Sequence, residues 1–189
     1  MTGVVSDMYM GYWDEIFKQK LAENNINVKL YQRYKDDIDL VLENTEENGK
    51  DQQEKEKSIL RKCIEVADDI HASIKVTGHI PSNYNDKRLP ILDLKVWIGE
   101  VKPNIFKIIT AHYIKDVSTR AVINNRSSHP LRMKKNVMIN EVMRILRNCN
   151  EYCPWDEVAH HISYFMKRLQ FSGYDQVFRY ETVRIATYI

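Results

Sequence analysis

The sequence predicts an α+β fold in which antiparallel hairpins pack with helices and a helical lobe follows. Apolar residues recur every three or four positions near the N-terminus and over the last third of the chain, which is typical of amphipathic helices. Between these regions, two stretches alternate apolar and polar residues, which is typical of strands. The 189 residues are 43% hydrophobic, which suffices for the core of one compact domain or two small lobes.

Two helices are expected in the first half of the chain. The first runs from about residue 8 to residue 23, with Asp7 as its N-cap. The second has an apolar stripe from Ile59 to Ile74, and we expect it to end near the latter residue. Residues 43–57 are polar apart from one glycine, which predicts a solvated loop or the frayed start of this helix.

A second hairpin is expected in the middle of the chain. Residues 92–98 place leucine, valine and isoleucine on one face of a strand. A turn over residues 99–104 returns the chain. Residues 105–113 alternate again, so we expect them to form the antiparallel partner.

The last third is expected to be a helical lobe. Ser128 can cap a helix with Pro130 near its first turn, and the buried stripe of this helix lies within residues 138–149. A further helix starts near Pro154, and Gly173 is its expected C′ residue.

The small net charge of +2 conceals an uneven distribution. Residues 114–150 contain eight lysines and arginines but only two acidic residues, which gives this segment +6 and leaves −4 for the rest of the chain. Such a basic segment favours a polyanionic partner. The alternative is an ordinary solvated helix face.

The composition also indicates the compartment. We find no apolar run long enough to span a bilayer and no signal peptide, so we expect an intracellular protein, nuclear or organellar and not secreted. Three cysteines are too few and too uneven for a disulfide framework. Cys149 and Cys153 with His160 and His161 form only a weak zinc pattern, because consecutive histidines diverge on a helix.

The first expected hairpin carries the most specific chemical signal. Its strands run through residues 28–34 and 38–42, and its tip is Lys35-Asp36-Asp37. Two adjacent carboxylates on a tight turn repel each other, and a divalent cation would neutralise them. Two-metal phosphoryl-transfer sites need carboxylates of this kind on rigid strand ends. The alternative is an ordinary turn, because aspartate is favoured in turns.

Tyr34-Lys35-Asp36-Asp37 resembles the Tyr-x-Asp-Asp hairpin of reverse transcriptases. Other segments, in the matching order, are similar to motifs of the branch found in Penelope-like retroelements. They are Gly3 with Ser6, Leu89-Pro90-Ile91-Leu92-Asp93-Leu94, Tyr113-Ile114-Lys115 with Thr119, Ser127-Ser128-His129-Pro130 with Lys134, and Gly173-Tyr174. The resemblance implies a partial polymerase palm over residues 1–113 and a helical thumb over residues 114–189.

The resemblance also implies roles for individual residues. Catalysis is implied for Tyr34, Asp36 and Asp37, and the two aspartates would bind Mg²⁺ or Mn²⁺. Gly3 and Ser6 would contact the template and the incoming nucleotide. The implied partners are an RNA template and a DNA primer. Contacts with the primer and the nucleic-acid backbone are implied for Tyr113, Lys115, Arg126, Ser128, His129, Arg132, Lys134 and Lys135.

The family has a third metal-binding carboxylate and a fingers region that precede the part resembled here. We therefore expect this chain alone to be inactive, with both supplied by another segment or a separate chain. The alternative is a reverse-transcriptase-derived subunit that binds nucleic acid, or has a structural role, in a larger assembly without catalysis. A plain α+β protein with coincidental motifs is a third and weaker alternative.

Overall fold

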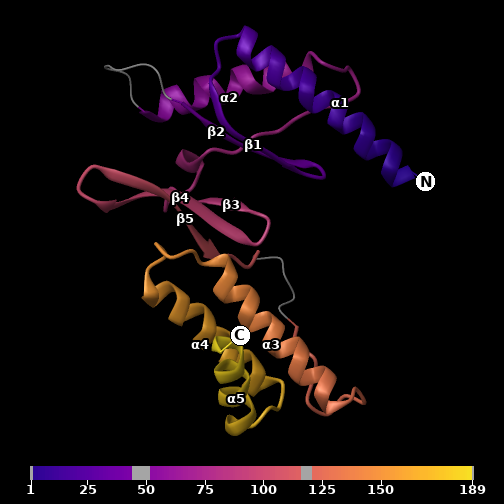
Figure 1. Ribbon diagram of the computed structural model, residues 1–189, viewed down its shortest axis with the longest axis vertical. Coiled ribbons are helices and arrows are strands. Elements are labelled where there is room, and N and C mark those ends of the chain that lie inside the picture. Colours follow the sequence, from indigo (N-terminus) through magenta and orange to yellow (C-terminus); the bar gives the residue numbers. More distant parts are fainter. Residues whose placement is uncertain (1, 44–51, 116–120, 189) are drawn as a thin grey trace. The chain divides into compact units, whose positions relative to one another are not determined.

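The computed structural model describes residues 2–43, 52–115 and 121–188 (Figure 1). Within these ranges the chain forms five α-helices and two small antiparallel sheets, which confirms the expected α+β class and the helical C-terminal region. The chain divides into two compact units, Met1–Asn83 and Tyr84–Ile189, called the first and second unit below. The expected palm–thumb boundary between residues 113 and 114 is a functional division, and it stays a prediction.

The first unit consists of a two-stranded hairpin covered by two helices (Figure 1). Side chains from both helices form its core, and the hairpin residues that pack on it are Val28, Tyr31, Ile38, Leu40 and Leu42. The buried members from the helices are Trp13, Phe17, Leu21, Cys63 and Ala67. The elements are α1 (Thr2–Glu23), β1 (Val28–Tyr34), β2 (Asp37–Leu42) and α2 (Gln52–Asp68), followed by the short 3₁₀-helix η1 (Pro81–Asn83).

Helix α1 begins earlier than expected, whereas α2 begins within residues 43–57, where the frayed start of this helix was one of the two expectations. Helix α1 begins at Thr2, so Asp7 lies inside the helix and is not its N-cap. Gly3 and Ser6 therefore lie on α1 and not ahead of it. Helix α2 begins at Gln52, because the glutamines, glutamates and lysines before the apolar stripe are good helix formers. Residues 44–51 of the expected loop lie outside the described residues.

The C-terminal end of α2 also differs from the expectation. The helix ends at Asp68, and Ile74 lies beyond it. The Asp68 carboxylate accepts a hydrogen bond from the backbone N–H of Val76 at 2.9 Å, which holds the departing chain against the helix end. Ile74 and Val76 still pack on the core, so the last apolar residue of the expected stripe contacts the core although it lies outside the helix.

The second unit begins with a three-stranded antiparallel sheet in the order β3–β4–β5. The strands are β3 (Leu89–Ile91), β4 (Leu94–Lys102) and β5 (Ile105–His112). Pairing of β4 with β5 confirms the expected hairpin. The strand expected over residues 92–98 is wrong at its start, because Ile91 pairs with Leu94 and the intervening Leu92 and Asp93 form a turn.

Three helices complete the second unit (Figure 1). Their shared core contains the expected stripe residues Met138, Val142 and Ile145. Pro130 occupies the N-cap of the first helix and no side chain caps it, so the expected cap at Ser128 is wrong. The last helix was not expected, although Asp175 is a side-chain N-cap that accepts a hydrogen bond from the Phe178 N–H at 2.7 Å. The helices are α3 (Leu131–Asn148), α4 (Trp155–Phe171) and α5 (Gln176–Thr187).

Gly173 ends α4 in the way the sequence predicts. It has a φ of +85°, and the N–H groups of Gly173 and Tyr174 donate to the carbonyls of Gln170 and Leu169 at 3.0 and 3.1 Å. These two bonds define a Schellman motif, in which the C′ residue is left-handed.

Gly173→Ala is expected to lower the free energy of unfolding by about 1–2 kcal/mol, because a Cβ disfavours the left-handed conformation. Gly11→Ala is the matched control: a methyl group there meets no neighbouring atom within 4 Å, so the change is expected to add about 0.5–1 kcal/mol. Urea denaturation followed by circular dichroism measures both. Equal effects of the two substitutions would contradict the motif.

Candidate metal and nucleic-acid site

The two aspartates of the first hairpin lie at a tight turn. Tyr34 pairs with Asp37 across the hairpin, so Lys35 and Asp36 form a two-residue turn and Asp37 opens strand β2. The side chains of Tyr34, Asp36 and Asp37 are all exposed. Lys35 has a φ of +55°, a conformation that is costly for a residue with a Cβ. The hairpin is confirmed as expected, and its carboxylates point to solvent at one end.

A buried ion pair connects this turn to helix α1. The Nε of Arg33 donates to the Asp14 carboxylate at 2.7 Å, and its Nη1 donates to the Lys35 carbonyl at 2.9 Å. The hydroxyl of Tyr31 donates to the same carboxylate at 2.5 Å. Burial, together with the Asp14 carboxylate, raises the pKa of Tyr31, so the phenol stays protonated and donates. The turn is therefore tied to the unit's core by charge-assisted hydrogen bonds.

A third carboxylate lies on the strand that follows the turn. Asp39 is half-buried and, two positions after Asp37, shares its face of β2. Partial burial, and then the negative charge of Asp37, raise the pKa of Asp39. The spacing of two residues between Asp37 and Asp39 on an expected strand is the signal in the sequence for this third carboxylate. Oxygen ligands of this kind suit Mg²⁺ and Mn²⁺.

The other sequence-predicted residues of the first unit lie on α1. Ser6 is exposed on that helix, and Gly3 lies one turn earlier. No described group of three or more histidine, cysteine, aspartate or glutamate side chains has the arrangement of a complete metal site. The described cysteines and histidines of the weak zinc pattern form no such group.

In the second unit, the Leu89–Leu94 motif forms a tight connection to α3. Asp93 lies in the turn between β3 and β4, where its carboxylate contacts Arg144 at 2.7 Å and Asn148 at 2.9 Å. Partial burial raises the pKa of Asp93, but the bonds from Asn148 and Arg144 outweigh it, so this pKa lies below its usual value. These bonds hold the turn in place although Leu92 has a φ of +52°. The aspartate of this motif therefore has a structural role.

The Ser127–Lys134 motif forms the start of α3. Lys134 is only 5% exposed, and its ammonium group donates to the carbonyls of Asn125 and Ser127 at 2.7 and 2.8 Å. His129 Nδ1 lies 3.3 Å from the hydroxyl of Ser127. The resemblance implies a nucleic-acid contact for Lys134, but in the structure its ammonium group donates to two loop carbonyls inside the unit.

The remaining predicted nucleic-acid contacts of the second unit lie at its surface. Tyr113 is half-buried, with the Lys95 ammonium 5.7 Å from its ring centre. Lys135 is partly exposed, and the exposed members are Lys115, Arg126, Ser128, His129 and Arg132. Thr119 of the Tyr113 motif lies outside the described residues.

Lys134 and its neighbour Lys135 give a matched pair of substitutions. Lys134→Met is expected to lower the free energy of unfolding by about 2 kcal/mol, because two loop carbonyls lose their donor. Lys135→Met is expected to change stability by less than about 0.5 kcal/mol. Lys135→Met alone is expected to weaken the salt dependence of binding to an RNA–DNA hybrid duplex. The slope of log K against log salt concentration is expected to fall in magnitude by about 1.

Denaturation curves and fluorescence anisotropy at several salt concentrations measure the two properties. The assignment of Lys134 to the interior is contradicted if its methionine variant keeps full stability or loses as much salt dependence as the Lys135 variant.

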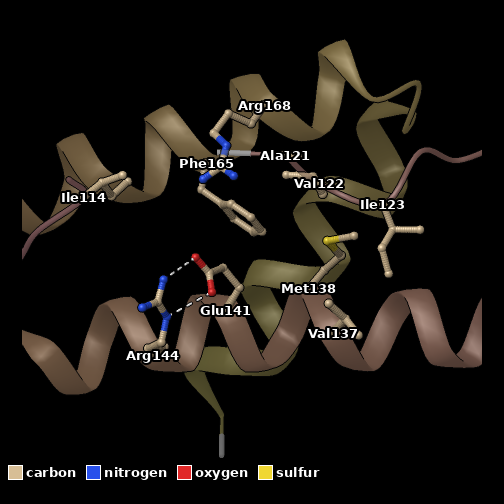
Figure 2. Close-up of a pocket in the computed structure, with 10 residues that line it drawn as sticks. All are labelled: Ile114, Ala121, Val122, Ile123, Val137, Met138, Glu141, Arg144, Phe165 and Arg168. Atoms are coloured by element: carbon tan, nitrogen blue, oxygen red, sulfur yellow. Dashed lines mark hydrogen bonds and ion pairs between the residues drawn. The ribbon is translucent and has the colours of Figure 1, made fainter. Parts of the chain in front are cut away.

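A cavity of about 310 Å³ lies between α3 and α4 in the second unit (Figure 2). Met138 and Phe165 contribute apolar side chains, and Glu141, Arg144 and Arg168 contribute charges. Figure 2 shows that Arg144 holds Glu141 through two nitrogens, at 3.0 and 2.9 Å. Glu141 compensates the charge of one of the two arginines, and the rest of the lining is apolar.

Comparisons of the chain with protein-family models, with curated proteins and with solved structures found no match. Among the described residues, no helix is both long enough and apolar enough to cross a membrane.

Proposed function

We propose that this chain contributes an aspartate-bearing hairpin and a nucleic-acid-binding helical lobe to a metal-dependent nucleotidyl-transfer site, as part of an RNA-directed DNA polymerase. The observation that carries the proposal is the turn with Asp36 and Asp37, exposed to solvent yet tied to α1 through Arg33 and Asp14. Exposure leaves the carboxylates accessible to a ligand, and the ion pair restricts their movement. Such preorganisation is what a catalytic carboxylate needs.

The clustering of charge supports a cation at this turn. Three carboxylates fall within four consecutive residues, and the charge of Asp37 already raises the pKa of Asp39. In the proposal, Asp36 and Asp37 would hold Mg²⁺ or Mn²⁺, which would neutralise charge and activate the attacking hydroxyl when bound. A complete two-metal site also takes a further carboxylate, and the proposal assigns it to another segment or a separate chain. Tyr34, exposed beside the pair, would support the primer end.

The second unit supplies the proposed contact with the template and primer. Arg126 and Arg132 flank the N-terminal end of α3 with their side chains exposed, and Lys115 is exposed at the other end of the connecting segment. Contacts of this kind with phosphates are independent of base sequence and weaken with salt. The family's palm and thumb domains correspond, in this proposal, to residues 1–113 and 114–189.

A non-catalytic nucleic-acid-binding subunit is the second candidate. The observation that favours it is Lys134, because a lysine of the resembled thumb motif has a structural role here. The motif at the start of α3 can thus have a role in stability without a role in catalysis. The exposed basic residues would then remain as a binding surface without chemistry.

Metal binding at the turn distinguishes the two candidates. In ¹⁵N-labelled full-length chain, substoichiometric Mn²⁺ is expected to broaden the amide signals of residues 34–38 first, because paramagnetic broadening falls steeply with distance. Asp36→Asn with Asp37→Asn is expected to abolish this broadening, whereas Glu15→Gln on an exposed part of α1 is the control that keeps it. Absence of preferential broadening at the turn at millimolar Mn²⁺ would contradict the catalytic proposal and favour the second candidate.

A further inference from the structure

The loop between α3 and α4 brings two cysteines together. Cys149 is the C-cap of α3, and Cys153 directly precedes Pro154, the N-cap of α4. The Cys153 N–H donates to the Asn150 carbonyl at 3.0 Å, which closes a tight turn between the two cysteines. Their thiols are hydrogen-bonded to each other. We call this pair the loop dithiol, and no part of the proposed function uses it.

The loop dithiol is more accessible than the third cysteine of the chain. Cys149 and Cys153 are free thiols on partly exposed residues. Cys63 lies in the core of the first unit and is only 7% exposed. Burial raises the pKa of Cys63, which disfavours the reactive thiolate. A small oxidant in solution therefore reaches the loop dithiol more readily than Cys63.

Within the pair, Cys153 keeps its proton at neutral pH. Burial, and then the charge of Cys149 and the hydrogen bond with it, raise the pKa of Cys153 to about 12. The Glu157 carboxylate adds to this rise, and the Arg88 guanidinium opposes it. Because the thiolate and not the thiol is the nucleophile, the first attack on an oxidant falls to Cys149.

We propose that Cys149 and Cys153 form a site of reversible oxidation by hydrogen peroxide, which joins them in a disulfide across the α3–α4 loop. Disulfides that sense oxidants form transiently in reducing compartments, so the lack of a structural disulfide framework does not argue against one. The proposal goes beyond the proposed function and does not depend on it, because it involves neither metal nor nucleic acid.

The chemistry balances in two steps. The Cys149 thiolate attacks one oxygen of the peroxide, which breaks the O–O bond, forms a sulfenic acid and releases hydroxide. The hydroxide takes up the proton that Cys149 lost. Because the sulfenic acid is uncharged, the pKa of Cys153 then falls, and its sulfur attacks the sulfenic sulfur, forms the S–S bond and releases water. The two thiols lose two electrons and two protons in total, and the peroxide is reduced to two waters.

The same loop covers the outer edge of β5, the last strand of its sheet. The backbone N–H of Asn150 donates to the Thr110 carbonyl at 3.2 Å. Its side-chain amide donates to the Ile108 carbonyl at 2.8 Å and accepts from the Thr110 N–H at 3.4 Å. A disulfide between the residues on either side of this turn leaves the loop fewer conformations. We therefore expect oxidation to hold these bonds to β5 more firmly.

Peptide mapping of the full chain after exposure to hydrogen peroxide tests the proposal. The treated chain is denatured and alkylated with N-ethylmaleimide without reduction. We expect Cys149 and Cys153 in one linked peptide pair and Cys63 alkylated, and dithiothreitol is expected to restore alkylation of all three. Cys149→Ser is expected to leave Cys153 reduced, whereas Cys153→Ser is expected to accumulate sulfenic or sulfinic acid at Cys149. Cys63→Ala is the matched control that keeps the disulfide.

Hydrogen exchange measures the consequence for the sheet edge. The Thr110 amide is expected to exchange severalfold more slowly in the oxidised chain, and at an unchanged rate in peroxide-treated Cys149→Ser. Alkylation of all three cysteines after treatment of the unchanged chain overturns the site, as does sulfinic acid at Cys149 without a disulfide. A disulfide that leaves the exchange of Thr110 unchanged overturns the coupling to β5.

Discussion

Replacing Asp14 with alanine is expected to lower the free energy of unfolding by about 3 kcal/mol. The side chains of Asp14 and Arg33 are only 12% and 15% exposed, so water does not replace the lost carboxylate. Arg33 would keep its bond to the Lys35 carbonyl, and for this reason we expect the low end of the range for broken buried ion pairs. Tyr31 would lose its acceptor as well.

Glu15→Ala is the matched control for this substitution. Glu15 neighbours Asp14 and also forms an ion pair, with Lys18 at 2.8 Å, but its side chain is 75% exposed. Exposed pairs contribute little, so a loss of less than about 0.5 kcal/mol is expected. Urea denaturation and hydrogen exchange of the β1 amides measure both variants. Similar losses for the two would show that burial of the Asp14–Arg33 pair is not what stabilises the first unit.

The same substitution has a consequence for the acidic turn. Arg33 connects Asp14 to the Lys35 carbonyl, and Lys35 holds an unfavourable backbone conformation. Without Asp14, the guanidinium keeps only its bond to the Lys35 carbonyl, and the turn loses its tie to α1. Asp14 is therefore a positioning residue in the proposed site, because it would act through Arg33.

The first hairpin could be predicted because two signals agree there. Strands β1 and β2 alternate in the sequence, and the aspartates at the turn are turn formers. The core-facing positions Ile38, Leu40 and Leu42 also follow from that alternation. The tie through Asp14 could not be predicted, since it joins residues 19 positions apart and depends on how α1 packs on β1.

The turn at Leu92 and Asp93 shows why strand ends are harder to predict. A two-residue turn preserves the alternation of apolar residues, so the pattern runs through it without a break. Leucine is also an unusual choice for a positive φ. The turn is stabilised by the bonds of Asp93 to Arg144 and Asn148, which lie about 50 residues further along the chain.

The basic segment illustrates a different limit. Net charge correctly identifies where positive side chains gather, but it does not distinguish Lys134 from Lys135. Lys134 is buried against two carbonyls, whereas Lys135 is partly exposed. The difference arises because successive residues of helix α3 point in different directions. The contacts of His112 could not be predicted from the sequence for the same reason, because its neighbours in the fold come from α3 and α4.

Loss of nucleotide incorporation is the second large effect that we expect. Two-metal stabilisation is worth several kcal/mol, so Asp36→Asn with Asp37→Asn is expected to reduce incorporation by about 100-fold or more. Because both side chains are exposed, the double variant is expected to fold normally, and circular dichroism checks this.

The most direct measurement of the central claim is primer extension by the assembly that contains this chain, isolated through an affinity tag on the chain. With an RNA template, a DNA primer and Mg²⁺ or Mn²⁺, we predict incorporation of labelled deoxynucleotide that the double variant loses and Glu15→Gln retains. Incorporation that continues unchanged in the double variant would contradict the claim that Asp36 and Asp37 carry the chemistry, as would an intact assembly that binds the template–primer and incorporates nothing.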